Sequence, residues 1–369
     1  MTIRRQLLNF GGYTTDYRMG CGALDELPRL LGGSVGKACR AFLLYGASED
    51  ESQVECVRRA LIDGGFSVSE LTVEETRATA FSTVERVLHA LATSGITGED
   101  LLVGFGDASV CSLASFSSRM WAGRLSCALI PTTLDAMITC PTAAGPFSLD
   151  EEGAAAGQQG LVSLMPEATL VVCDLDLVRT ASFERNALGF VRMVAAALTD
   201  SRRAWEGFEK RIEGLLSGGE IAYIEGVGAA LTARLNTVKS VSPASRKAFM
   251  YGETTAHALR ACLGSQFPEY QLLAEGLRFE ARIAVDAFGF SVDSMFLQDD
   301  YLEDLGVEEL TFELEPEVFI EALKRERFRE ANRFQLALPK NPGIIRLTSV
   351  DDEILERHAR AFLSSRSCA

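Results

Sequence analysis

The first half of this 369-residue chain alternates short apolar runs with segments of helical period, and this alternation restricts the fold more than any other feature. Residues 40–45 are an apolar run, residues 53–63 repeat apolar side chains with helical spacing, and residues 67–73 alternate again, which indicates a βαβ unit. Residues 82–94 and 101–104 continue the pattern as an amphipathic helix and a buried strand. Strands that alternate with helices predict a mostly parallel, doubly wound sheet.

After about residue 180 the pattern changes to long segments of helical period, at residues 183–198, 202–216, 244–263, 269–287 and 316–330. We therefore expect an α/β, Rossmann-like, doubly wound domain over residues 1–180. An all-α, mainly helical domain should follow over residues 181–369, with a cleft between the two. The length agrees, because domains usually have about 100–200 residues. Residues 142–160 are rich in Gly, Ala and acidic side chains, which favours a flexible loop.

Composition restricts the partners of the chain. A net charge of −15 and a pI near 4.8 mean that the average surface repels nucleic acids and anionic membranes. Nine cysteines without a C-x-x-C pair favour reduced thiols, and neither a secretory signal nor a membrane-spanning apolar stretch is visible. These features predict a cytoplasmic protein that binds neither nucleic acid nor a membrane.

Several motifs occur in the order found in one enzyme superfamily. Residues 128–137 (ALIPTTLDAM) are similar to the strand-to-loop segment V/I-P-T-T-L-L-A-M of 3-dehydroquinate synthases. Upstream, residues 83–86 match T-V-E-R; downstream, residues 252–258 (GETTAHA) are similar to G-H-T-x-G-H-A, and residues 275–281 (EGLRFEA) resemble I-G-M-x-x-E-A. From about residue 17 to residue 362 the chain thus resembles the dehydroquinate synthase, or sugar phosphate cyclase, superfamily.

The resemblance implies a dehydroquinate synthase-like fold, a homodimer and a defined chemistry. In that superfamily NAD transiently oxidises a sugar-like phosphate, zinc polarises the reacting carbonyl, phosphate is eliminated and an aldol step closes a carbocycle. The zinc is held by one glutamate and two histidines. Here Glu253 stands at the first histidine, Glu269 or Tyr270 at the second, and residues 190–192, where the glutamate falls, contain no acid. We therefore expect no metal ligands of the superfamily type and no zinc.

Another interpretation of the same residues stays open. Glu253 and His257 are four residues apart on a predicted helix, so they share one face and could form part of a different metal site with Glu269. A solvated or capped helix face is the plainer interpretation. By resemblance, His257 matches a histidine that assists the substrate phosphate and proton transfer, although a lone histidine is as often structural.

The cofactor loop of the superfamily is only partly retained. Gly104 and Gly106 remain near the end of a predicted strand, but the three-glycine run that lets a pyrophosphate approach is missing, and Asp107 adds a negative charge. Thr132 and Thr133 survive and could bind a nucleotide or serve as turn residues. NAD therefore stays a candidate cofactor, with Gly104, Gly106, Thr132 and Thr133 as its candidate contacts.

The anionic substrate of the superfamily loses most of its partners here. The loop that supplies an aspartate and a lysine corresponds to residues 138–147, which contain neither. Arg246 is retained, and Arg325 stands near the place of a C-terminal lysine. We assign His257, Arg246 and Glu253 as candidate catalytic residues, and Glu269, Arg325 and Thr139 as candidate substrate contacts.

Three functional hypotheses follow. The first is a repurposed enzyme of specialised metabolism, a metal-independent cyclase or lyase that acts on a small molecule in the interdomain cleft. The second is a non-catalytic relative that binds a ligand or an active homologue. The third is an NAD-dependent dehydrogenase of the glycerol dehydrogenase branch, which the missing glycine run and the scarcity of histidine oppose. We rank the first slightly above the second.

Overall fold

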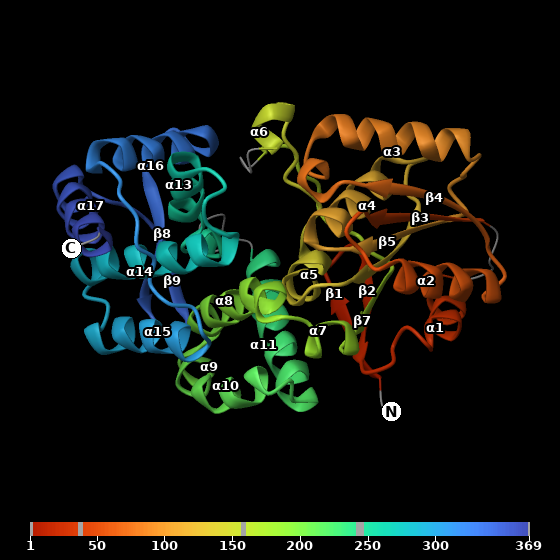
Figure 1. The fold of residues 1–369 in the computed structure, drawn as a ribbon, viewed down its shortest axis with the longest axis horizontal. Helices are drawn as coiled ribbons and strands as arrows, with labels where there is room; N and C mark the ends of the chain where they lie inside the picture. Colours follow the sequence, from red (N-terminus) through yellow and green to blue (C-terminus); the bar gives the residue numbers. More distant parts are fainter. Residues whose placement is uncertain (1–2, 36–39, 156–159, 241–246, 368–369) are drawn as a thin grey trace. The chain divides into compact units, whose positions relative to one another are not determined.

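The computed structural model describes residues 3–35, 40–155, 160–240 and 247–367 (Figure 1). The chain divides into two compact units, Met1–Asn186 and Ala187–Ala369. Within the described ranges, no helix has both the length and the apolar content needed to cross a membrane.

The first unit is built on a seven-stranded sheet in the order β1-β2-β7-β6-β5-β3-β4. Only the edge strand β1 is antiparallel to its neighbour, and the other pairs run parallel, so the predicted doubly wound sheet is confirmed. The strands are β1 (Arg4–Asn9), β2 (Thr14–Gly20), β3 (Arg40–Gly46), β4 (Ser67–Val73), β5 (Leu101–Gly106), β6 (Ser126–Pro131) and β7 (Leu170–Asp174).

Helices cover both faces of this sheet, as Figure 1 shows for α1 and α2 on one face and α3 and α4 on the other. The apolar side of α1 and α2 packs on alternate residues of the central strands, such as Leu43, Val103 and Ile130. On the opposite face α4 lies against Gly104 and Leu129. The helices are α1 (Leu27–Ser34), α2 (Glu51–Asp63), α3 (Phe81–Thr93), α4 (Ala108–Met120), α5 (Leu134–Thr139), α6 (Glu151–Ala155) and α7 (Asp176–Arg179), with 3₁₀ turns η1 (Glu75–Arg77) and η2 (Cys140–Thr142).

The described part of residues 142–160, namely 142–155 and Gly160, contains structure that the composition did not suggest. The short helix α6 forms within them, and Phe147 makes an antiparallel bridge with Val162. Gly160 is required there, because a Cβ at this position would come within 2.0 Å of the Phe147 backbone. In its described residues, the loop predicted from composition therefore contains a helix and a bridge, and residues 156–159 of that prediction lie outside the described residues.

Among the described residues of the second unit, the elements are helices apart from one hairpin, β8 (Gln335–Asn341) with β9 (Ile344–Ser349). The segment 202–216 is two helices rather than one, because the first ends at Gly207. In the described part of the segment 244–263, residues 247–263, an α-helix begins at Glu253. The helices are α8 (Phe183–Asp200), α9 (Arg202–Glu206), α10 (Glu209–Leu216), α11 (Glu220–Val238), α13 (Glu253–Leu263), α14 (Glu269–Phe288), α15 (Val292–Asp304), α16 (Pro316–Glu330) and α17 (Asp352–Arg366), with the 3₁₀ turn η3 (Lys247–Met250).

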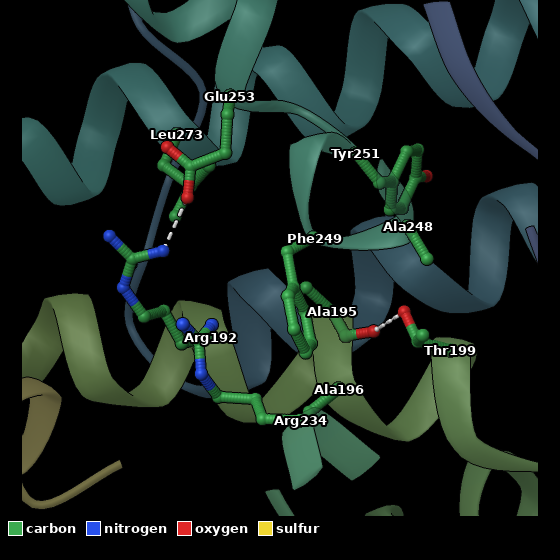
Figure 2. A pocket seen from close by; sticks show the side chains of 10 residues that line it. All are labelled: Arg192, Ala195, Ala196, Thr199, Arg234, Ala248, Phe249, Tyr251, Glu253 and Leu273. Atoms are coloured by element: carbon green, nitrogen blue, oxygen red, sulfur yellow. Dashed lines mark hydrogen bonds and ion pairs between the residues drawn. The ribbon is translucent and has the colours of Figure 1, made fainter. Parts of the chain in front are cut away.

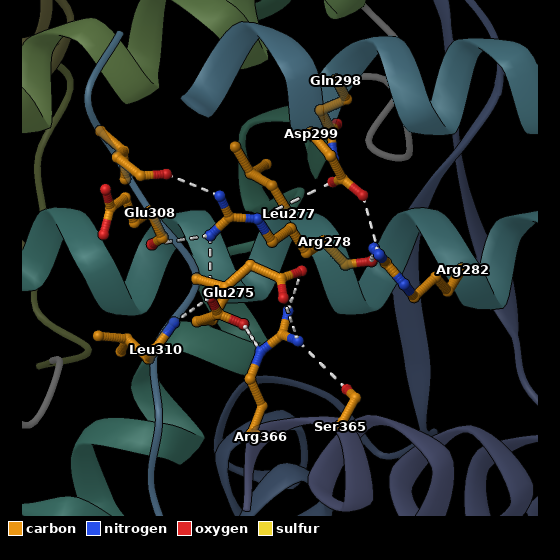
Figure 3. A network of polar contacts seen from close by, with 12 residues as sticks. Glu275, Leu277, Arg278, Arg282, Gln298, Asp299, Glu308, Leu310, Ser365 and Arg366 are labelled. Carbon is orange, nitrogen blue, oxygen red and sulfur yellow. Dashed lines mark hydrogen bonds and ion pairs between the residues drawn. The ribbon is translucent and has the colours of Figure 1, made fainter. Parts of the chain in front are cut away.

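A buried ionic network holds the second unit together (Figure 3). Glu275 and Arg278, one turn apart on α14, have fully buried side chains joined at 2.8 Å. The other Glu275 oxygen accepts from Arg366 Nε of α17 at 2.7 Å. Arg278 also donates to the Val307 carbonyl at 2.7 Å. The network therefore ties α14 to α17 and to the chain that follows α15.

Candidate functional site

In the first unit, the carboxyl ends of the parallel strands carry acidic side chains. Asp107, directly after β5, caps α4 by accepting hydrogen bonds from the Ser109 and Val110 amides, both at 3.0 Å. Burial raises the pKa of Asp107, and the capping bonds oppose that rise. A helix N-terminus behind a strand is where dinucleotide folds bind a pyrophosphate. In this chain the Ser109 and Val110 amides at that position already donate hydrogen bonds to the Asp107 carboxylate.

Two more carboxylates lie at the neighbouring strand ends. Glu49 accepts from the Thr132 hydroxyl at 2.6 Å and pairs with Arg185 at 3.1 Å, both within the first unit. Burial raises the pKa of Glu49, while Thr132 and Arg185 lower it. Glu75 accepts from the Ser48 amide at 2.9 Å, and its pKa is lowered because the bonds from Ser48 outweigh the effect of burial. The edge is thus acidic, which does not fit a pyrophosphate.

The four residues predicted to contact a cofactor have structural partners. Gly104 is required for packing, since a Cβ there would lie 2.6 Å from the Ala114 Cβ of α4. Gly106 ends β5, and its carbonyl accepts from the Thr132 amide at 2.9 Å. The Thr133 hydroxyl caps α5 by accepting from the Ala136 amide at 3.2 Å. The structure therefore brings Gly106 and Thr132 to one edge and uses all four residues for folding.

In the second unit, a cavity of about 30 Å³ is lined by charged side chains from three helices (Figure 2). Arg192 of α8 points at Glu253, the first residue of α13, and the two form an ion pair. The other end of the guanidinium lies 3.6 Å from the Glu269 carboxylate, at the start of α14. The side chains of Arg192 and Glu253 are 16% and 18% exposed, so this ion pair is largely shielded from water. One arginine thus bridges two carboxylates of different helices.

Two further groups lie near this ion pair: Arg234 lines the cavity, whereas His257 is not among the lining residues and lies beside Glu253. His257 Nε2 lies 3.9 Å from the second Glu253 oxygen. Arg234 of α11 stacks over the Phe249 ring, 4.3 Å from its centroid. Burial raises the pKa of Glu253, but the charges of Arg192, His257 and Arg234 outweigh burial, and the pKa is lowered overall. Glu253 is therefore ionised at neutral pH.

Two glycines that match the superfamily motifs in sequence, Gly252 and Gly276, fix the position of Glu253. Gly252, the cap of α13, has a φ of +81° and Gly276 of α14 packs directly on it, since a Cβ on Gly276 would lie 2.1 Å from the Gly252 carbonyl oxygen. Glu280, one turn further along α14, accepts from the Gly252 amide at 2.8 Å and from the Thr255 hydroxyl at 2.8 Å. These three residues hold the first turn of α13 and thereby aim Glu253 at the cavity.

Glu280 makes the stability of this unit depend on pH. Burial raises its pKa to about 8, and its bonds to Gly252 and Thr255 oppose that rise. An unfolded glutamate titrates near pH ~4.3, so between roughly pH 4.5 and pH 8 the folded state holds a proton that the unfolded state releases. The free energy of unfolding should therefore fall as pH rises, by up to about 1.4 kcal/mol per pH unit from this group.

The test is urea unfolding at several pH values between these limits. Glu280→Gln should remove this part of the slope, because the amide does not titrate. The matched control is Glu303→Gln on the exposed side of α15, which should leave the slope unchanged. Equal slopes in the wild type and in Glu280→Gln would contradict a protonated Glu280.

The other predicted site residues lie elsewhere. Arg246 is outside the described residues. Arg325 of α16 is exposed and pairs with Glu321 of its own helix at 3.3 Å. Thr139, at the end of α5 in the first unit, is buried and donates to the Asp135 carbonyl at 2.9 Å. The structure therefore brings together Glu253, His257 and Glu269, with neither Arg325 nor Thr139 among the residues that line the cavity.

Sequence reasoning missed the two arginines that line the cavity. Arg192 lies in the segment that corresponds to the zinc-binding glutamate of the superfamily, so the sequence analysis recorded only that this glutamate is missing. Arg234 lies within α11, in no motif of the superfamily. A signal for Arg192 was nevertheless present in the sequence. A basic residue stands in the segment of the superfamily glutamate, while Glu253 and Glu269 stand at its two histidines, so the charges of the site are exchanged.

Glu253, His257 and Glu269 do not form a metal site in this arrangement. Among the residues that the structure describes, no three His, Cys, Asp or Glu side chains converge closely enough to hold an ion. Glu253 and Glu269 are instead paired with Arg192. A cation beside that guanidinium would meet like charge, so the residues present do not fit a divalent metal.

Comparison with known proteins agrees with the motifs. No family model matches the chain. The 3-dehydroquinate synthase of Nocardia farcinica is 24% identical over 268 residues, which cover 72% of this chain and 70% of that protein. A 2-deoxy-scyllo-inosose synthase, solved with carbaglucose-6-phosphate, NAD⁺ and Co²⁺, superposes with a TM-score of 0.85 over 97% of this chain and all of that one, at 14% identity. The chain therefore has the dehydroquinate synthase-like fold and resembles 3-dehydroquinate synthases in sequence.

Two further solved structures show how the fold similarity differs between enzyme types. The 2-epi-5-epi-valiolone synthase of Streptomyces hygroscopicus, solved with NAD⁺ and Zn²⁺, has a TM-score of 0.81 at 13% identity and covers 95% of this chain and 97% of its own. The NADH-dependent butanol dehydrogenase of Thermotoga maritima, at 14% identity over 95% of this chain and 96% of that one, has a TM-score of 0.67. The fold is therefore closer to these cyclases than to this dehydrogenase.

Proposed function

We propose that this protein is a metal-independent cyclase or lyase that acts on a small anionic molecule at the cavity lined by Arg192 and Arg234, with His257 beside Glu253. The observation that carries the proposal is the ion pair of Arg192 with Glu253, which places a guanidinium where a metal would need its ligands. The fold of sugar phosphate cyclases supports the reaction class. Neither zinc nor NAD has a role in the proposal.

The lining of the cavity favours an anionic ligand. Arg192 and Arg234 give two positive charges against one negative charge from Glu253, a net charge of +1 among the lining side chains. Guanidinium groups recognise phosphate and carboxylate oxygens through paired donors. A volume of about 30 Å³ is room for a few water-sized groups, so the cavity takes the oxygens of one anionic group while the rest of the ligand lies outside it.

The chain's own residues can perform an elimination. His257 Nε2 removes a proton from the carbon next to a carbonyl, the bond to a departing phosphate breaks, and its electron pair leaves with the phosphate oxygen as a double bond forms. Arg192 and Arg234 stabilise the negative charge on that oxygen. Glu253, 3.9 Å from the imidazole, stabilises the protonated histidine that results.

The experiment measures phosphate release by the purified protein from a panel of keto-sugar phosphates. His257→Gln should lower the rate by roughly 10²–10⁴-fold, the usual contribution of a general base. His89→Gln, on the exposed surface of α3, is the matched control and should keep the wild-type rate. Metal and dinucleotide content should be sub-stoichiometric in the active sample. Turnover that requires added zinc and NAD would contradict the proposal.

A non-catalytic role is the second candidate, and one observation favours it. At the strand ends of the first unit, Asp107, Glu49 and Glu75 are paired with side chains or amides of the chain itself. A protein of this kind would bind the anionic ligand without turning it over. Ligand binding by calorimetry that is lost in Arg234→Met, together with no phosphate release by any variant, would favour this role over the enzyme.

A further inference from the structure

Arg192 lies between two carboxylates, as a bound cation would, but here the positive charge belongs to a side chain. Glu253 and Glu269 lie at the first residues of α13 and α14, and Arg192 reaches them from α8. His257 adds an imidazole nitrogen 3.9 Å from Glu253. Two carboxylates and one imidazole are a usual donor set for Zn²⁺ or Co²⁺.

We propose that the Arg192 guanidinium is a built-in cation that replaces a divalent metal, and that removing it converts Glu253, His257 and Glu269 into a metal site. The inference rests on the metal-independent function proposed above. Two solved structures with a similar fold, a 2-deoxy-scyllo-inosose synthase and a 2-epi-5-epi-valiolone synthase, contain Co²⁺ and Zn²⁺. Here the positive charge is covalently attached instead.

Electrostatics explains why the wild type excludes the ion. Arg192 neutralises Glu253 in a partly buried site, and its charge lies within a few ångströms of where a metal would bind. Without Arg192, Glu253 would stay largely buried with a charge and no strong partner, which is costly. A divalent ion bound by Glu253 and His257 would restore that charge balance. Glu269 is 59% exposed, so its side chain can rotate to complete the site.

The test compares Arg192→Met with the wild type. Methionine keeps much of the volume and removes the charge. Titration calorimetry with Zn²⁺ should show affinity at least about 100-fold tighter in the variant. Co²⁺ should give the variant a visible absorption band that the wild type lacks. Added Zn²⁺ should also raise the melting temperature of the variant and leave that of the wild type unchanged.

Arg192→Met/Glu253→Gln is the control, because it removes the buried charge together with its partner. It should fold without metal and bind Zn²⁺ no better than the wild type does. If Arg192→Met unfolds in the absence of metal, recovery of its fold by Zn²⁺ supports the proposal. Failure of Zn²⁺ to restore it, while the double variant folds, overturns the proposal.

The two proposals fail separately. Unchanged Zn²⁺ affinity in Arg192→Met overturns the built-in cation and leaves the proposed elimination standing. Stoichiometric Zn²⁺ held by the wild type, with turnover that depends on it, overturns both. Phosphate release that is absent from all variants, together with the new metal site in Arg192→Met, overturns only the catalytic proposal.

Discussion

Replacing Glu275 with glutamine should lower the free energy of unfolding by about 3–5 kcal/mol, the cost of leaving a buried ionic network without one partner. Both Glu275 oxygens are in use, one by Arg278 and the Leu310 amide and the other by Arg366. The amide cannot accept at both ends, and it would direct N–H groups at a guanidinium. Arg278 is fully buried and has no access to water.

Urea unfolding measures this effect, because most domains are stable by only about 5–15 kcal/mol. Trp205, buried in the second unit, provides the fluorescence signal, and Trp121→Phe removes the other tryptophan of the chain. Glu321→Gln is the matched control: it breaks an exposed pair on α16 and should cost at most about 1 kcal/mol. A loss below about 1 kcal/mol in Glu275→Gln would mean that the network contributes little to stability.

Elements with a clear apolar period could be predicted from the sequence. Strand β4 has the predicted bounds, and α2 and α3 begin within two residues of the predicted starts. Strands β1 and β2 gave no such signal, because their sequences RRQLLN and TTDYRMG are rich in polar residues. Asp16 of β2 is nevertheless buried, since Arg5 and Arg18 pair with its carboxylate. Ion pairs between side chains of adjacent strands leave no periodic trace in the sequence.

The candidate site was predictable only in part. Spacing alone placed Glu253 and His257 on one face of a helix, and the structure confirms that geometry. The contact with Arg192 joins residues 61 positions apart, and no local pattern indicates it. The motif containing Glu280 suggested a superfamily but not a role, and the structure shows that this residue holds the start of α13. A sequence identifies the residue types of a site more readily than the pairs they form.

Replacing Gly276 with alanine should destabilise the second unit by about 3 kcal/mol, at the upper end of the usual cost of overpacking. The added methyl group would lie 2.1 Å from the Gly252 carbonyl oxygen and 3.2 Å from the Ala256 amide nitrogen, and both are backbone atoms. Neither can rotate away, so α13 and α14 must separate. Helix propensity favours alanine by about 1 kcal/mol, which the clash should outweigh.

Gly228→Ala in α11 isolates the propensity effect, because a Cβ there meets no atom within 4 Å. That control should gain about 0.5–1 kcal/mol of stability. Separation of α13 from α14 should also displace Glu253 from Arg192, so Gly276→Ala should weaken anion binding, whereas Gly228→Ala should bind like the wild type. If Gly276→Ala matches Gly228→Ala in both stability and binding, the close crossing of α13 and α14 does not position the site.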